Sequence, residues 1–158
     1  MKIYITMTGP SDWAILNSLW AVVRLRNYIP DRIYILTIKK RRAQAELAKK
    51  RFTALLREFD SKPQIRIIQV READFVGTGR HINSVVCEEK SQGNTVAIEV
   101  TPGRKALVAG ALVPGIQGNA DHVFYLYLED FEYANNLFLR IPLTKQHSHD
   151  FMEEIKDA

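Results

Sequence analysis

The sequence predicts a Rossmann-like α/β fold, doubly wound and mostly parallel, formed by one domain over residues 1–158. Short runs rich in β-branched and aromatic residues alternate with longer segments of helical periodicity along most of the chain. Strands joined by helical crossovers pair in parallel, because the right-handed connection permits little else. Five such strands favour the order 3-2-1-4-5, with helices on both faces of the sheet.

The first half of the chain has the clearest alternation. KIYITM at residues 2–7 indicates a buried strand, and residues 11–27 repeat apolar side chains at the spacing of a helix that packs on a sheet. RIYILT at 32–37 is the second expected strand, and residues 41–59 have the pattern of an amphipathic helix. A Lys-Pro pair ends that helix, and QIRIIQV at 64–70 is the third expected strand.

The second half continues the alternation and then loses it. Residues 74–89 are expected to be helical, TVAIEV at 95–100 to be the fourth strand, and 103–113 to be a helix of small residues. DHVFYLYL at 121–128 is the fifth expected strand. The pattern weakens after this point, and the last expected elements are a short edge strand at 137–143 and a helix at 145–155.

Composition indicates an ordinary globular protein. Hydrophobic residues make up 46% of the chain and charged residues 25%, which excludes disordered and fibrous classes. The net charge of +4 favours a partner that carries phosphate. Cys87 is the single cysteine, so no internal disulfide can form. It is expected to be buried on a helix.

The same observations favour a cytoplasmic location. Met1 leads directly into a strand pattern, without a cleavable signal. The longest apolar run, at residues 106–116, is too short to cross a bilayer. A longer parent protein with a membrane segment or a fused effector stays an open alternative.

The expected topology places a ligand site at the ends of strands one and four. These strands are neighbours in the order 3-2-1-4-5, and the direction of winding reverses between them. Ligands of open parallel sheets bind at such a switch point, beyond the carboxyl ends of the strands. The candidate ligand-binding residues are Thr8, Gly9, Pro10, Ser11, Asp12, Thr37, Thr101, Pro102, Gly103, Arg104 and Lys105.

Most of these residues fall in two loops, at residues 8–11 after the first strand and at 101–105 after the fourth. The first loop has features of an anion site. Gly9 lets the backbone approach a ligand closely, and Pro10 fixes the path into the helix. Ser11 or Asp12 is expected to cap that helix, whose free N–H groups favour anions. The charge of Asp12 opposes a phosphate, so a ribose hydroxyl or the helix itself is its expected partner. An ordinary strand-to-helix turn explains this loop equally well.

The second loop is more informative. Thr101 offers a hydroxyl, and Gly103 permits close approach of the backbone. Arg104 and Lys105 place two cations at a helix start, where they oppose the helix dipole. An anionic ligand would remove this conflict, although two solvated basic residues remain the alternative. Neither loop has the glycine spacing of a Walker or dinucleotide-binding motif.

Other charged and aromatic residues are weaker candidates. The basic run at residues 39–42 either extends a positive rim over the site or is a solvated face. His147 and His149, with Asp150, resemble a partial metal set, but residues two apart do not share a helix face, and no metal is expected. Trp13 is expected to pack in the core rather than stack on a base.

Residues 96–111, VAIEVTPGRKALVAGA, resemble the CARF family, the CRISPR-associated Rossmann-fold sensors of cyclic oligoadenylates. The family has a hydrophobic strand, a Thr-Gly-Gly-Thr-Lys-like loop and a helix of small residues. Thr101, Gly103 and Lys105 hold their expected places, whereas Pro102 replaces a glycine and Arg104 a threonine. The turn at residues 8–11 is also similar to the first ligand loop of the family.

The resemblance implies a homodimer that binds a ring of four or six adenylates across its twofold axis, in type III CRISPR antiviral signalling. Ser11, Lys105 and backbone N–H groups of both loops would contact the ring, and Arg104 would reach it too. The favoured interpretation is a sensor of cyclic tetra-adenylate, with no cofactor and no direct DNA binding.

Two alternatives come from other functional classes. A metal-independent ring nuclease would use the same pocket, with Ser11 and Lys105 as the candidate catalytic residues that align a ribose 2′-hydroxyl and stabilise developing charge. A generic nucleotide-binding protein of Rossmann type would have no link to CRISPR signalling. The sequence shows no obvious general base, so the nuclease is a less favoured interpretation than the sensor.

Overall fold

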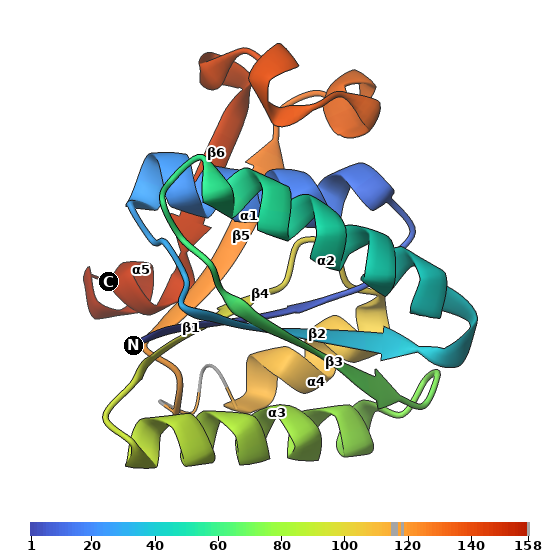
Figure 1. Ribbon diagram of the computed structural model, residues 1–158, viewed down its shortest axis with the longest axis vertical. Coiled ribbons are helices and arrows are strands. Elements are labelled where there is room, and N and C mark those ends of the chain that lie inside the picture. The colour runs from blue at the N-terminus through green and yellow to red at the C-terminus, as the bar shows by residue number, and fades with distance from the viewer. Residues whose placement is uncertain (115–116, 118, 158) are drawn as a thin grey trace.

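A computed structural model describes residues 1–114, 117 and 119–157 of the chain (Figure 1). Its six-stranded sheet has the order β3-β2-β1-β4-β5-β6, which confirms the expected order of the first five strands. All pairs are parallel except β5 and β6, which are antiparallel. The strands are β1 (Lys2–Met7), β2 (Arg32–Ile38), β3 (Gln64–Val70), β4 (Thr95–Glu99), β5 (His122–Leu128) and β6 (Gln146–Asp150).

Helices cover both faces of this sheet, as the sequence predicts. In Figure 1, α1 and α2 lie above the sheet, and α3 and α4 lie below it. The helices are α1 (Asp12–Arg26), α2 (Arg42–Arg57), α3 (Phe75–Ser91), α4 (Lys105–Pro114) and α5 (Phe151–Asp157). Short 3-10 turns are η1 (Lys39–Arg41), η3 (Phe131–Asn135), η4 (Phe138–Arg140) and η5 (Leu143–Lys145).

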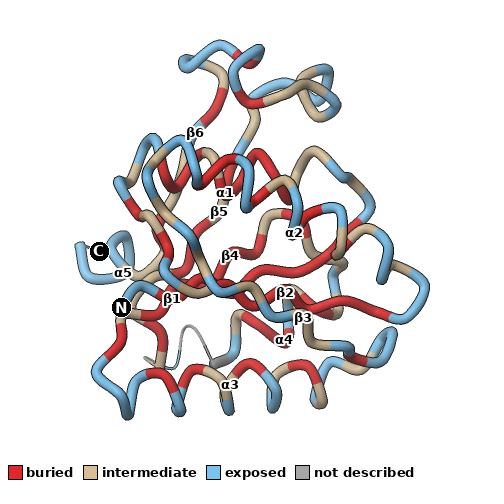
Figure 2. The backbone as a smooth tube through the Cα atoms, in the orientation of Figure 1, coloured by how far each residue is buried: buried red, intermediate tan, exposed pale blue. Residues whose placement is uncertain are grey.

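The central strands are buried on both sides, so that the core has two layers (Figure 2). Side chains alternate along each strand, and successive residues of β1 therefore enter different layers. The layer toward α3 and α4 includes Ile3, Ile5, Met7, Ile82 and Leu107, and the layer toward α1 and α2 includes Tyr4, Leu19, Ile33, Ile35 and Phe52. Strands of this kind are near-continuous apolar runs, which is why the sequence indicated them clearly.

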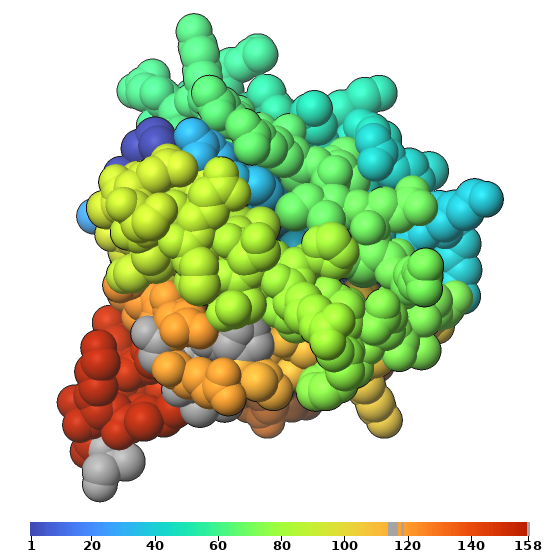
Figure 3. Space-filling view, turned by 90° about the horizontal axis from the view of Figure 1, so that it is seen from below, coloured from blue at the N-terminus to red at the C-terminus, as the bar shows by residue number. Residues whose placement is uncertain are grey.

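Helix α3 covers much of the face seen in Figure 3 and packs closely on α4. The contact is made by backbone at two glycines. A Cβ at Gly110 would lie 2.8 Å from the carbonyl oxygen of Phe75, and a Cβ at Gly79 would lie 3.1 Å from the carbonyl oxygen of Gly110. The glycines therefore permit a helix contact that larger side chains would prevent.

The C-terminal part of the chain differs from the prediction. Residues 137–143 form no strand, and they contain η4 and the start of η5 instead. Pro142 lacks the N–H group that a ladder needs, and Phe138 is buried with its ring stacked on Trp20 at 5.7 Å. The edge strand is the polar segment β6, and the last helix is α5, which starts at Phe151 rather than at residue 145. An edge strand with a solvent-facing side has no need of an apolar sequence.

Two smaller expectations concern the exposure of Cys87 and the length of the apolar helices. Cys87 is exposed on α3, which corrects its expected burial. Within the described part of the chain, no helix is long and apolar enough to cross a membrane. Residues 115 and 116 of the apolar run at 106–116 lie outside the described residues.

The pairing of β1 with β4 brings two loops into direct contact. Ile5 lies opposite Ile98 in the ladder, so both strands end at the same edge. A Cβ at position 9 would overlap the carbonyl oxygen of Pro102. Gly9 is therefore required by the approach of one backbone to another, and the loops that follow β1 and β4 form one continuous surface.

We expect Gly9→Ala to lower the free energy of unfolding by about 2–3 kcal/mol, because the methyl group must separate the two loops. Gly93→Ala is the matched control: Gly93 has a φ of +75° and nothing within 4 Å of its Cβ position. The control should lose about 1 kcal/mol, from backbone strain alone. Urea unfolding of the three proteins measures both effects, and equal losses in the two variants would contradict the loop contact.

Candidate functional site

The start of α2 holds the first loop in place. Arg41 donates a hydrogen bond to the carbonyl oxygen of Gly9 at 2.7 Å, and Gln44 donates to the same oxygen at 3.0 Å. Gln44 also donates to Asp12 at 2.6 Å. Arg41 thus has a structural role within the basic run at residues 39–42, and the carboxylate of Asp12 faces α2. The hydrogen bond from Gln44 to Asp12 joins α2 to α1, and the periodicity of the sequence gave no indication of it.

Ser11 is the N-cap of α1. Its hydroxyl oxygen accepts a hydrogen bond from the backbone N–H of Ala14 at 3.2 Å, so one of the two expected capping residues has this role. Pro10 is exposed beside it. Trp13 is partly buried against the core beneath the guanidinium of Arg51, whose carbon lies 5.3 Å from the ring centroid. This end of α1 presents backbone N–H groups, which favour an anion.

The hydroxyls of Thr8 and Thr37 bind each other. They lie 2.8 Å apart, and both residues are fully buried. The pair joins the carboxyl ends of β1 and β2. Both hydroxyls are therefore engaged inside the protein, where they help to fix the backbone that follows β1 and β2.

Thr101 is also held from within. Its backbone N–H donates to a carboxylate oxygen of Glu99 at 2.8 Å, and its hydroxyl donates to the same oxygen. The hydroxyl in turn accepts a hydrogen bond from the N–H of Leu126 at 2.7 Å. Thr101 therefore connects the second loop to β4 and β5, and its hydroxyl is already engaged.

Glu99, like Gln44 and Glu72, is a residue of this edge of the sheet that sequence reasoning missed. It is fully buried, and burial raises the pKa of its carboxyl to about 8, although hydrogen bonds from Thr101 oppose the shift. At neutral pH the carboxyl is therefore largely protonated. Its second oxygen has no partner among the described residues. A glutamate inside TVAIEV, a strand expected to be buried on both sides, was the available signal.

Arg104 and Lys105 lie at the start of α4, directly after Pro102 and Gly103 in the chain. Both basic residues line a cavity of about 310 Å³. A second cavity of about 650 Å³ shares Ile38 and Glu72 with the first, and its basic lining residues are Lys39, Lys40 and Arg71. Among the described residues, no carboxylate forms an ion pair with Lys105. The carboxyl edge of the sheet thus gathers positive charge around two open cavities.

A larger cavity, of about 700 Å³, lies at the opposite edge of the sheet. Lys2, Asp31 and Arg32 line it, next to the starts of the strands. Ligands of open parallel sheets bind at the carboxyl ends of the strands, and the switch-point loops are at the other edge. We therefore assign the candidate site to the two smaller cavities that share Glu72, the first of which is lined by Arg104 and Lys105.

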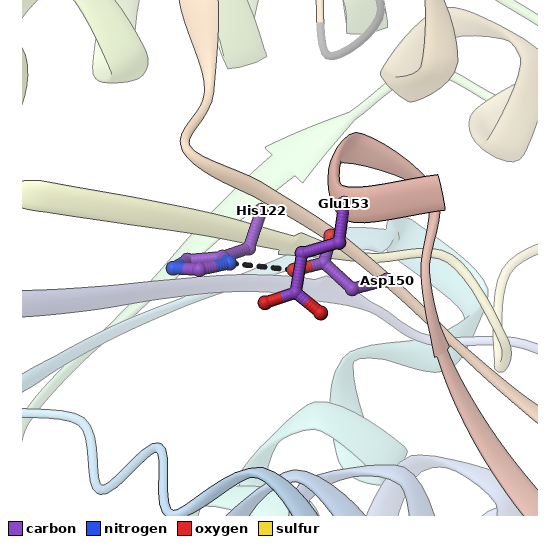
Figure 4. A group of neighbouring side chains, drawn as sticks. All are labelled: His122, Asp150 and Glu153. Atoms are coloured by element: carbon purple, nitrogen blue, oxygen red, sulfur yellow. Dashed lines mark hydrogen bonds and ion pairs between the residues drawn. The ribbon is translucent and has the colours of Figure 1, made fainter. Parts of the chain in front are cut away.

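Histidine and carboxylate side chains also come together away from this site (Figure 4). His122, at the start of β5, lies 2.6 Å from Asp150, and Glu153 is close enough to complete a set of three potential metal ligands. Each carboxylate already has a protein partner. Asp150 accepts hydrogen bonds from the backbone N–H groups of residues 123 and 152, and Glu153 pairs with Arg26 at 3.0 Å. These contacts attach β6 and α5 to the sheet.

The metal set considered from the sequence does not assemble. His147 pairs with Glu129 at 2.9 Å, and His149 pairs with Glu154 at 2.7 Å. Residues two apart in a strand point to the same side, and the rings of His147 and His149 both lie near the ring of Tyr127, at 6.2 and 6.5 Å between centroids. Asp150 is the next residue after His149, so it points to the other side of β6, where it is buried.

The burial of Glu99 predicts a pH-dependent stability. Its pKa is raised in the folded protein, so its stabilising contribution is complete below about pH 4.5 and decreases as the pH rises to about 8. Glu99→Gln keeps a neutral acceptor for Thr101 and removes this titration. Relative to the variant, the parent should lose on the order of 4 kcal/mol of unfolding free energy between pH 4.5 and 8.

Urea unfolding from pH 4.5 to 9 measures this difference. Glu88→Gln, at an exposed glutamate of α3, makes the same change in net charge and should keep the pH profile of the parent. Parallel profiles for the parent and Glu99→Gln would show that Glu99 is ionised in the folded protein.

Comparison with known proteins places the fold. No family model matches the chain, and no curated protein matches it in sequence. Among solved structures, Enterococcus italicus Csm6 bound to cyclic hexa-2'-fluoro-hexa-dAMP is similar over 99% of this chain and 43% of its own, with a TM-score of 0.65 and 16% identity.

Two further solved structures are similar. Can2 from Sulfobacillus thermosulfidooxidans, in complex with cyclic tetra-adenylate, matches 79% of this chain and 32% of its own, at a TM-score of 0.55 and 18% identity. A type III CRISPR defence DNA nuclease activated by cyclic oligoadenylate matches 80% of this chain and 19% of its own, at a TM-score of 0.59 and 18% identity. The chain thus spans less than half of each of these longer proteins and shares the Rossmann-like fold of the parts that it matches.

Proposed function

We propose that this chain is a CARF-type sensor domain that binds a cyclic oligoadenylate, with cyclic tetra-adenylate preferred, in type III CRISPR antiviral signalling. The observation that carries the proposal is the direct contact of the β1–α1 and β4–α4 loops, beside the cations of α4. The three similar structures support it, since their ligands or activators are cyclic oligoadenylates. We place the domain in the cytoplasm, where such a ligand would be made.

The ligand would bind through charge and backbone. A cyclic oligoadenylate carries one negative phosphodiester for each nucleotide, and Lys105 and Arg104 lie beside the shared surface of the two loops. Backbone N–H groups at the start of α1 add a second anion-binding element. The buried threonine hydroxyls would act indirectly, because their bonds fix the loops before the ligand arrives.

We propose a twofold homodimer as the binding unit. A ring with an even number of adenylates has a symmetry that matches a twofold protein axis. Residues 8–12 and 101–105 of both protomers would then face one basin, and each protomer would contact half of the ring. The similar proteins are longer than this chain, which is consistent with an effector domain that such a sensor would control.

The side-chain contacts favour a sensor over a ring nuclease. A metal-free cleavage needs a group that takes the proton of the attacking 2′-hydroxyl. The hydroxyl of Ser11 caps a helix, Asp12 accepts from Gln44, and the carboxyl of Glu99 is buried. Glu72 lines the same cavity as Lys105, but its carboxylate pairs with Lys40 and Arg104. Among the described residues, these engagements leave Lys105 to stabilise charge without an unpaired carboxylate beside it.

Lys105→Ala should weaken binding of cyclic tetra-adenylate by about 1.5–3 kcal/mol per site, the range for hydrogen bonds to charged groups. Lys62→Ala is the control, since Lys62 is exposed and lines the cavity at the opposite edge. Isothermal titration calorimetry should show unchanged affinity for the control and one ring for two chains. An unchanged affinity of Lys105→Ala would exclude the second loop as the phosphate site, and one ring for each chain would argue against the homodimer.

We also expect tight binding with little or no turnover in a buffer that contains chelator. Chromatography of the ligand after one hour should recover the intact ring. Ser11→Ala should cost about 1 kcal/mol of stability through loss of the helix cap and leave the ring equally intact. Rapid formation of linear products with cyclic phosphate ends, abolished by Ser11→Ala or Lys105→Ala, would establish the nuclease instead.

A further inference from the structure

One carboxylate joins three loops at the carboxyl edge of the sheet. Glu72, in the loop after β3, lies 2.6 Å from the ammonium of Lys40, which follows β2. The same oxygen of Glu72 accepts a hydrogen bond from Arg104, which follows β4. Glu72 also lines both cavities of the candidate site, and it is the one carboxylate among the described residues that line them.

This carboxylate occupies cations that a phosphate would also use. Carboxylate and phosphate oxygens accept hydrogen bonds from the same guanidinium and ammonium donors. The side chains of Glu72, Lys40 and Arg104 are 45%, 56% and 39% exposed, so an incoming anion can reach all three. The pKa of Glu72 is held below its usual range, first by the hydrogen bond from Lys40, so the group is ionised at neutral pH. An ionised Glu72 therefore competes with any anion at this edge.

The backbone next to Glu72 is strained. Ala73 has a φ of +58°, in the left-handed region that non-glycine residues rarely adopt. The loop is fixed on both sides of this residue: Glu72 by its two cations, and Asp74 by capping α3, where it accepts a hydrogen bond from Gly77 at 2.7 Å. Loss of the ion pairs would remove one of the two restraints that keep Ala73 in this conformation.

We propose that Glu72 is an intramolecular competitor that sets the affinity of this site for its anionic ligand. In the free domain it pairs with Lys40 and Arg104. A ligand phosphate takes those donors, displaces the carboxylate and frees the loop at residues 71–74, at the start of α3. The inference rests on the proposed function, since the ligand it describes is the one assigned to the same site.

Glu72→Gln tests the competition, with Glu46→Gln as the matched control. Glu46 is also part of an exposed ion pair, at 2.9 Å from Arg42 within α2, so both variants change the net charge equally. The probes are cyclic tetra-adenylate and inorganic pyrophosphate, titrated by calorimetry. Glu72→Gln should bind both about three- to tenfold more tightly, and the control should change less than twofold. In a background of Lys40→Gln with Arg104→Gln, the gain should vanish.

The two probes separate this inference from the proposed function. A gain for pyrophosphate without any binding of cyclic tetra-adenylate would support the competition and overturn the proposed ligand. Binding of cyclic tetra-adenylate by the parent with equal or weaker affinity in Glu72→Gln would overturn the competition and leave the ligand in place. If neither protein binds pyrophosphate, freed cations do not attract an anion here, and the competition is equally overturned.

Hydrogen exchange tests the release of the loop. Amides in the first turn of α3 should exchange faster in the parent when the ligand is bound, and faster in Glu72→Gln without ligand. Glu46→Gln should match the free parent. Equal protection of this turn in all samples would contradict the release.

Discussion

The approach of two backbones at Gly9 and Pro102 is the constraint on which this domain depends. It requires a glycine on one side, a parallel pairing of β1 with β4 beneath it, and a helix start beyond each loop. Buried hydrogen bonds at Thr8 and Thr101 then fix each loop to its neighbouring strand. The surface that results is formed before any ligand arrives, which lowers the entropy that binding must overcome.

Polar side chains at this edge are divided between support and recognition. Those that point into the protein, such as Thr37 and Glu99, bind other residues of the chain. Those that remain accessible are mostly cations, and Glu72 holds two of them. In the proposed function, a site with this division would recognise an anion by its charge and shape, while the buried groups determine the geometry. The pattern explains why removal of a buried group should act on stability before it acts on binding.

The sequence predicted the features that repeat along the chain. Apolar runs and helical periodicity were sufficient for the strand order, and the order located the two loops without any family knowledge. The failures have local causes: the apolar segment at residues 137–143 contains Pro142 and packs on α1, whereas a polar segment pairs at the sheet edge. The contacts of Glu72 and Gln44 join elements far apart in sequence. Such pairings depend on the assembled fold, and no local pattern encodes them.

The glycine contact between α3 and α4 has a mechanical consequence. Because Gly79 meets Gly110 through backbone atoms, the two helices are in direct backbone contact where they cross. We therefore expect α3 and α4 to move together as a rigid unit, one end of which lies at Arg104 and Lys105. At the far end of α3, Glu89 is fixed to β2 by Arg32 at 2.6 Å. That anchored end would act as the pivot, so that a small shift at the ligand edge becomes a rotation of the whole helix pair against the sheet.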